Sequence, residues 1–169
     1  MSVYVGEKFA CIKIAGRANF SSSIDFRTLV NELVQKGYKY FVLDLSECTL
    51  MDSTFLGVLA GFGLKMNASQ KDATDPAIEL RNPNPRIMDL LESLGVLHLF
   101  KVAQGACSTL ETAEPLAHDP VSATREEVTR ACLEAHRTLM EINPENVSKF
   151  KEVAQFLADD LKKLKPTPN

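Results

Sequence analysis

The residues best suited to chemistry lie between a short apolar segment and a longer amphipathic one. Residues 40–45 are almost all apolar, which is typical of a strand covered on both faces. A polar connection at 46–52 leads to Ser53, at the predicted start of a helix over 54–67, where its hydroxyl can accept from an unpaired backbone N–H. Working groups of α/β proteins usually lie at this end of a sheet. We therefore expect Ser53 to be reachable from outside, although spacing alone fits a plain helix cap equally well.

The predicted helix over 54–67 is apolar on two sides. One stripe suffices to pack on a sheet; it consists of Leu56, Leu59, Ala60, Gly63 and Leu64. The second stripe is covered by the C-terminal part of the chain or left for a partner, and we predict a partner-binding face made of Phe55, Val58, Phe62 and Met66. Gly57 and Gly61 lie one turn apart, which indicates close approach of another backbone.

The elements around this segment predict an α/β domain with a mixed sheet flanked by helices. A hairpin is expected first, and then a helix that is capped by one of three serines and stopped by Gly37. Prolines 83 and 85 place a turn before the third helix. The expected strands are 3–5, 9–15, 40–45, 77–81 and 96–102, and the expected helices are 21–36, 54–67 and 86–94.

The C-terminal part predicts a helical hairpin. Residues 103–123 carry two prolines and are expected to form a loop or a short helix. Thr124 and Glu127 form a capping box, and Asn143-Pro144 supplies a cap and a proline for a second helix. We predict a domain over 1–115, a linker over 116–123 and a helical extension over 124–169. The extension is expected to pack on its own domain, with dimerisation to a homodimer or a separate partner as alternatives.

The segment around Ser53 resembles the phosphorylation signature of the STAS domain family, found in bacterial anti-sigma-factor antagonists and in the tails of sulfate transporters. The signature stands here as Asp44-Leu45-Ser46 followed by Met51-Asp52-Ser53-Thr54. Weaker matches are Ile14-Ala15-Gly16, Leu80-Arg81-Asn82 and 90–99, so that the resemblance covers roughly residues 3–115. No membrane segment precedes the domain, which favours an antagonist over a transporter tail.

The resemblance implies partner switching. The dephosphorylated protein would bind an anti-sigma-factor serine kinase, which phosphorylates Ser53 and releases it, and a phosphatase would reverse the modification. Asp52 is the acidic residue of the signature, Thr54 follows the phosphoacceptor, and Asn19 lies near the place where many members carry an aspartate. Phe55 departs from the glycine of many members. The alternative is a STAS scaffold or oligomerisation module whose serine is never phosphorylated.

Composition argues against several other functions. A net charge of −3 with scattered basic residues provides no surface for direct nucleic acid binding, and no apolar run is long enough to span a membrane. We expect a cytoplasmic protein that is not an enzyme and that needs no cofactor or metal. The four cysteines show no CxxC spacing, which indicates reduced thiols rather than disulfides or a zinc site. A serine hydrolase needs glycines flanking the serine and a histidine near it. The chain has three histidines, His98, His118 and His136, and none of them lies in a sequence context that places it beside Ser53.

Overall fold

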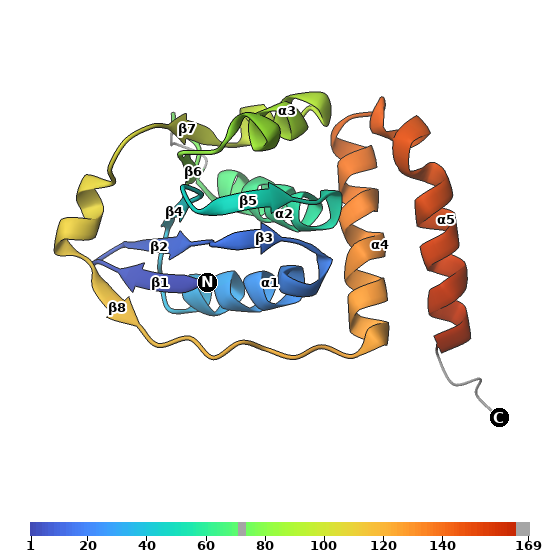
Figure 1. Cartoon of the computed structure of the whole chain (residues 1–169), viewed down its shortest axis with the longest axis horizontal. Helices are drawn as coiled ribbons and strands as arrows, with labels where there is room; N and C mark the ends of the chain where they lie inside the picture. The colour runs from blue at the N-terminus through green and yellow to red at the C-terminus, as the bar shows by residue number, and fades with distance from the viewer. Residues whose placement is uncertain (71–73, 165–169) are drawn as a thin grey trace.

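The computed structural model describes residues 1–70 and 74–164. These residues form eight strands, five α-helices and two 3₁₀ helices (Figure 1). The strands are β1 (Ser2–Val5), β2 (Phe9–Lys13), β3 (Gly16–Ala18), β4 (Tyr40–Asp44), β5 (Cys48–Met51), β6 (Ile78–Arg81), β7 (Lys101–Ala103) and β8 (Glu114–Leu116). The helices are α1 (Phe20–Gln35), α2 (Ser53–Ser69), α3 (Pro85–Ser93), η1 (Leu97–Leu99), η2 (Ser108–Thr112), α4 (Arg125–Ile142) and α5 (Asn146–Leu164).

The main sheet is mixed, as the sequence predicts, with the strand order β7-β6-β4-β2-β1-β8. β1 forms the expected antiparallel hairpin with β2, whereas β4 runs parallel to both of its neighbours, β2 and β6. Phe41, Leu43 and Leu45 are buried on the face of the sheet that carries α2, whereas Tyr40 on the opposite face is 52% exposed, so the cover on both faces that we expected for residues 40–45 is only partial. β4 therefore delivers the chain to the functional segment from the middle of the sheet.

A second, two-stranded parallel sheet joins β3 to β5. Both strands lie where we expected other structure: β3 follows the predicted first hairpin, and β5 lies inside the predicted polar connection 46–52. Each strand is only three or four residues long, so that neither shows a usable hydrophobic period. The small sheet brings the residues that precede α1 and α2 side by side.

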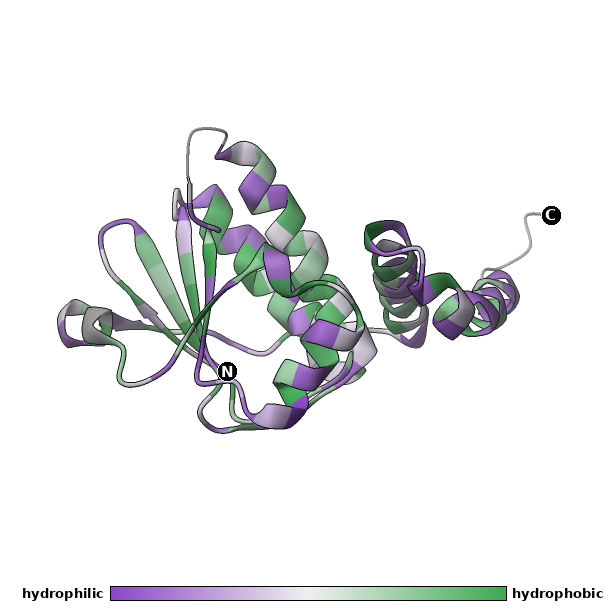
Figure 2. Ribbon diagram, turned by 90° about the horizontal axis from the view of Figure 1, so that it is seen from above, coloured by the Kyte–Doolittle hydropathy of each residue, from purple (hydrophilic) through white to green (hydrophobic). Residues whose placement is uncertain are grey.

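Helices α1 and α2 lie together against the sheet, as Figure 2 shows from above. Phe26 of α1 is fully buried, and its ring centroid lies 5.0 Å from that of Phe55 in α2. Phe62 of α2 packs edge to face on both Phe26 and Phe41 of β4. The aromatic side chains of both helices thus share one core with the central strand.

The end of the sheet differs from the prediction for residues 96–102. A 3₁₀ turn over Leu97–Leu99 precedes the short strand β7. The segment expected to be a loop or a short helix contains β8, which pairs with β1 at the edge of the sheet. Pro115 lies inside β8, which is tolerated because an edge strand bonds on one side only.

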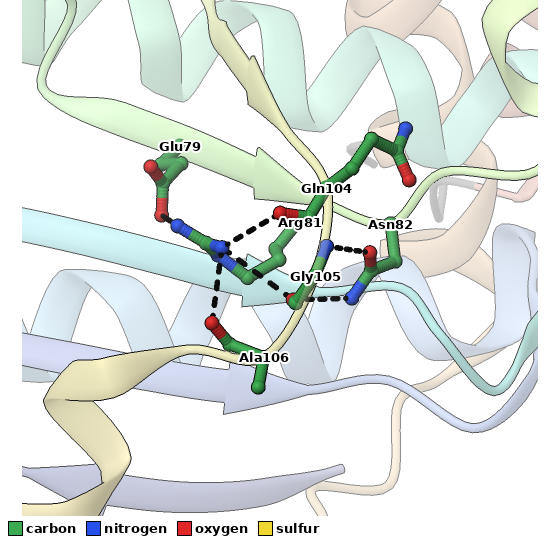
Figure 3. A network of polar contacts seen from close by, with 6 residues as sticks. All are labelled: Glu79, Arg81, Asn82, Gln104, Gly105 and Ala106. Atoms are coloured by element: carbon green, nitrogen blue, oxygen red, sulfur yellow. Dashed lines mark hydrogen bonds and ion pairs between the residues drawn. The ribbon is translucent and has the colours of Figure 1, made fainter.

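A polar network fixes the loop between β7 and β8 (Figure 3). The Arg81 guanidinium donates to the carbonyls of Gln104, Gly105 and Ala106, at 3.2–3.4 Å, and forms an ion pair with Glu79. Asn82, at φ 58°, exchanges two hydrogen bonds with the backbone of Gly105. The chain is thereby directed from the end of β7 toward the β1 edge.

Residues 117–124 lead from β8 to α4 as an extended connection that is tied to α1. The carboxylate of Asp25, in α1, is bonded by the His118 ring at 3.0 Å and accepts from the Val121 N–H at 3.0 Å. Thr124 and Glu127 then form the predicted capping box of α4. The second helix of the predicted hairpin begins at Asn146, so that Pro144 lies in the turn and is not its first residue.

The hairpin packs on its own domain, as expected. In Figure 1, α4 lies across the N-terminal ends of α1 and α2, and α5 lies on the outer side of α4. Asn146, at the joint, is buried and donates to the carbonyls of Leu94 and Leu139. The Lys149 ammonium group donates to the Ser93 carbonyl. The extension is therefore held both at the starts of α1 and α2 and at the end of α3.

Candidate functional site

The start of α2 is organised by Asp52 rather than by Ser53. Asp52 is the N-cap: its Oδ1 accepts from the Phe55 N–H at 2.8 Å, and its Oδ2 accepts from the Phe20 N–H at 2.8 Å. The expectation that Ser53 caps the helix is therefore wrong, because the carboxylate one residue earlier takes this role. Ser53 is the first helical residue, and its hydroxyl is available for other contacts at the positive end of the helix dipole.

Asn19 plays the corresponding part for α1. Its side-chain oxygen accepts from the backbone N–H groups of Ser21 and Ser22, and the Ser22 hydroxyl completes a capping box. The three serines that we expected to provide the cap thus lie inside the helix. Because Asp52 also accepts from the first residue of α1, the starts of both helices meet at this carboxylate.

The hydroxyl of Ser53 is bonded to a histidine of the extension. Ser53 Oγ lies 2.9 Å from Nε2 of His136 in α4, and Nδ1 of the same ring lies 2.7 Å from the Cys132 carbonyl oxygen. A carbonyl only accepts, so Nδ1 carries a proton, and in the neutral form of the ring Nε2 accepts from the Ser53 hydroxyl. Our expectation that no histidine points to Ser53 is therefore wrong, because α4 folds back onto α2.

The next residues of α2 are also in contact with α4. Thr54 is buried and lies beside the Cys132 thiol, whose pKa is raised by burial. A Cβ added at Gly57 would lie 2.5 Å from the carbonyl oxygen of Ala135. The close approach that we predicted from the glycines is thus made at Gly57, by a helix of the same chain.

The predicted partner-binding face is not exposed. Phe55 is 0% exposed, Phe62 and Met66 are buried, and Val58 is half-buried beside α4. The second apolar stripe of α2 packs on α1 and α4, which explains why this helix is apolar on two sides. The prediction of an open partner-binding stripe is therefore wrong, and any partner that binds near Ser53 must use other side chains.

The paired Ser53 and His136 form a hydroxyl with a base held in one orientation, which is the arrangement that makes a serine oxygen more nucleophilic. The glycines of a nucleophile elbow are absent, because Met51 and Phe55 occupy those positions. A pocket of about 190 Å³ opens where α1, α2 and α4 meet, and its lining includes neither Ser53 nor His136. This pocket therefore gives an ester or amide substrate no access to the Ser53 hydroxyl.

The part of the chain that the structure describes holds neither a metal-binding cluster nor a membrane-spanning helix. No group of three or more His, Cys, Asp or Glu side chains there is placed to hold a metal ion. No helix within residues 1–70 or 74–164 combines the length and the apolarity needed to cross a bilayer. All four cysteines are described, and no disulfide joins them.

Sequence reasoning missed His136 as a neighbour of the site, although two signals were present. Gly57 stands one turn after Ser53 and indicates a close neighbouring backbone. Ala131 and Ala135 are small residues on the apolar face of the extension, where such a neighbour could come from, and His136 adjoins them. Combining these signals would have required knowing that the first helix of the hairpin crosses α2.

Comparisons with known proteins agree with this fold. The STAS domain model matches residues 1–113, a match that ends before α4. The chain is similar to the Thermotoga maritima protein TM1081, with 20% identity and a TM-score of 0.55 over 64% of this chain and 90% of that chain.

Two further solved structures, both of SpoIIAA, share the fold. One is the anti-sigma factor antagonist SpoIIAA in its unphosphorylated form, with 15% identity and a TM-score of 0.53 over 64% of this chain and 89% of that chain. The other is the Bacillus cell fate determinant SpoIIAA in its phosphorylated form, with 15% identity and a TM-score of 0.50 over 64% of this chain and 92% of that chain. No protein with curated annotation matches the chain.

Proposed function

Because this chain belongs to the STAS domain family, we propose that it is an anti-sigma-factor antagonist that works by partner switching. In this proposal the unmodified protein binds an anti-sigma-factor serine kinase, phosphorylation of Ser53 ends the complex, and a phosphatase restores the binding form. The observation that carries the proposal is the place of the Ser53 hydroxyl at the N-terminus of α2, beside an Asp52 that is fixed by two backbone N–H groups.

A helix N-terminus can accept a phosphoserine without unfolding. The phosphate adds about −1.5 to −2 charges at pH 7, and the positive end of the helix dipole stabilises negative charge. Asp52 already contributes a negative charge one residue away. The modification therefore changes the charge and the bulk of the surface around Ser53, while the sheet and its core stay intact.

We assign the partner-binding surface to exposed apolar side chains beside the phosphosite. Phe20 is 51% exposed and its backbone binds Asp52, and Leu50, two residues before Asp52, is 40% exposed. An interface on these side chains excludes water from its centre. A doubly charged phosphate in such an interface loses its hydration without a partner, which is costly. Phosphorylation should therefore release the partner.

The proposal is tested by mass and by affinity. Protein recovered from its native cells should carry phosphate on the peptide containing Ser53, and Ser53→Ala should bind the kinase but accept no phosphate. Phe20→Asp and Leu50→Asp should weaken kinase binding by about 2 kcal/mol or more, whereas the same change at exposed Leu64, on the second half of α2, serves as a control. Equal binding by phosphorylated and unmodified protein would refute the proposal.

The scaffold alternative is favoured by one observation, the hydrogen bond that engages the Ser53 hydroxyl with His136. In that interpretation the serine is structural and is never modified, and the domain acts by holding a partner or a second copy of itself. Consistent absence of phosphate from Ser53 in native cells, together with a partner that binds Ser53→Ala and wild type equally, would support it.

A further inference from the structure

The first turn of α2 packs closely on the middle of α4. Three successive contacts join them: Ser53 Oγ to His136 Nε2 at 2.9 Å, Thr54 to the Cys132 thiol, and the Gly57 backbone against the Ala135 carbonyl. A methyl group at Gly57 would already overlap this carbonyl. Nothing larger than the hydroxyl hydrogen therefore fits between Ser53 and α4.

His136 is itself held in place by the hairpin. Its Nδ1 donates to the Cys132 carbonyl, its ring centroid lies 4.9 Å from that of Phe150 in α5, and the residue is 5% exposed. Turning the imidazole away would break the bond to Cys132 and the contact with Phe150. The ring therefore moves with the two helices rather than independently of them.

A phosphoryl group on Ser53 conflicts with this arrangement. It would place phosphorus and three further oxygens where the hydroxyl hydrogen now faces His136. Its charge of about −1.5 to −2 would lie one residue from Asp52 and against the imidazole of His136, at a position that is already half-buried. Phosphate oxygens that are buried without enough donors cost more than they gain.

We propose that docking of the α4–α5 hairpin and phosphorylation of Ser53 exclude each other, so that the hairpin is an intramolecular gate on the phosphoacceptor. This proposal rests on the function proposed above in one respect only, because that function is the reason why a cell would phosphorylate Ser53. Because coupling between two equilibria is reciprocal, a phosphate that weakens docking implies a docked hairpin that hinders phosphorylation. The gate adds to partner switching a control that lies within the chain.

The phosphoryl transfer takes place on the open form. The Ser53 Oγ forms a bond to the terminal phosphorus of a nucleoside triphosphate held by the partner kinase, the bond from that phosphorus to the bridging oxygen breaks, and the diphosphate leaves. The hydroxyl proton, which His136 Nε2 accepts as a hydrogen bond in the closed form, passes to a base of the kinase. Opening removes His136 and leaves the oxygen free for in-line attack.

The decisive experiment installs phosphoserine at position 53 of the full chain during translation, so that no kinase is needed. Amide hydrogen exchange is then compared with that of the unmodified protein. Exchange in α4 should become faster by a factor between about 5 and 150, the usual range of such couplings, while β2 and β4 keep their protection. Phosphoserine at Ser46, an exposed residue of the preceding turn, is the matched control and should leave α4 unchanged.

A disulfide staple tests the same coupling in the opposite direction. A Cβ built at Gly61 lies 3.7 Å from Cγ2 of Thr138, so Gly61→Cys with Thr138→Cys should join α2 to α4 two turns away from Ser53. In the oxidised double variant, phosphoserine at 53 should no longer increase α4 exchange, and a reducing agent should restore the increase. If the phosphorylated chain unfolds as a whole, Ser53→Glu against Ser53→Gln provides the comparison with a smaller group.

The outcomes separate the gate from the proposed function. Unchanged or increased protection of α4 in the phosphoserine protein, as would follow if His136 took up a proton and bound the phosphate, overturns the gate and leaves partner switching standing. Release of α4 by installed phosphoserine, in a protein that carries no phosphate in its native cells, supports the gate and refutes the partner-switching function. Equal exchange for Ser53→Glu and Ser53→Gln also counts against the gate.

Discussion

Gly57→Ala and Gly61→Ala make a matched pair for measuring how tightly α4 packs on α2. Both residues lie in the same helix, one turn apart, so the gain in helix propensity is the same for each, about 1 kcal/mol. The surroundings differ. The new Cβ at position 57 would meet the carbonyl oxygen, carbonyl carbon and Cβ of Ala135 at 2.5–2.7 Å, whereas that at position 61 would meet only Thr138 Cγ2 at 3.7 Å.

The magnitude follows from this difference. At position 61 the contact is an ordinary van der Waals distance, and Gly61→Ala should raise the free energy of unfolding by up to about 1 kcal/mol. At position 57 the methyl overlaps backbone atoms that cannot turn aside, and overpacking of this kind costs about 1–3 kcal/mol. Because the propensity gain cancels, Gly57→Ala should be less stable than Gly61→Ala by about 1–3 kcal/mol.

Urea unfolding of both variants measures this difference, and hydrogen exchange shows where it arises. In Gly57→Ala the loss of protection should be confined to α4 and α5, because a shift of α4 relieves the overlap without disturbing the sheet. If the two variants are equally stable and α4 keeps its protection in both, the close contact with Ala135 does not exist in solution. The gate argued from it would then lose its main structural support.

The remaining predictions concern the cap, the core, the extension and one buried thiol. Asp52→Ala should lower the free energy of unfolding by about 1–2 kcal/mol, and Asp52→Asn, which keeps an acceptor oxygen, by less. Phe55→Ala should lower it by about 3–5 kcal/mol in urea titration, in contrast to the mild effect expected of a surface residue. Removal of residues 124–169 should lower the melting temperature or cause dimerisation on size exclusion, because α2 loses its cover; an unchanged monomer would contradict this. Burial raises the pKa of the Cys11 thiol from 9.0 to about 12, so the unfolded chain loses this proton at lower pH than the folded one, and stability should fall between pH 9 and 12 with a smaller slope in Cys11→Ala.

Elements with a strong local signal were predictable from the sequence. The continuous apolar run of β4, the hairpin of β1 and β2 and the capping box at Thr124 each appear where their residues indicate. Strands β3, β5 and β8 were not predicted, because they are three or four residues long and exist through pairing with distant segments. Pro115 even argued against a strand until its place at the sheet edge was known.

The candidate site was predictable only in part. The signature singled out Asp52 and Ser53, but it did not show that Asp52 is the helix cap. Asp52 takes this role because its carboxylate bonds to the start of α1 as well as to its own helix. The burial of Phe55 could not be predicted from a helical wheel, since a wheel does not show which of the two apolar stripes of α2 is buried. The contact with His136 joins residues 83 positions apart, and no local pattern encodes such a pairing.

The anchoring of the connection on Asp25 limits how far an opened hairpin can travel. Val121 is fixed to α1 by its backbone N–H, and α4 begins at Arg125, so the free tether is the three residues 122–124, and the four Cα–Cα steps from Val121 to Arg125 span about 14 Å when fully extended. A segment on so short a tether remains at an effective concentration in the millimolar range near its own binding surface. Any partner that occupies α2 in place of α4 must therefore compete with a segment that stays tethered beside it. The tether length and the strength of docking together set the partner concentration at which the protein responds.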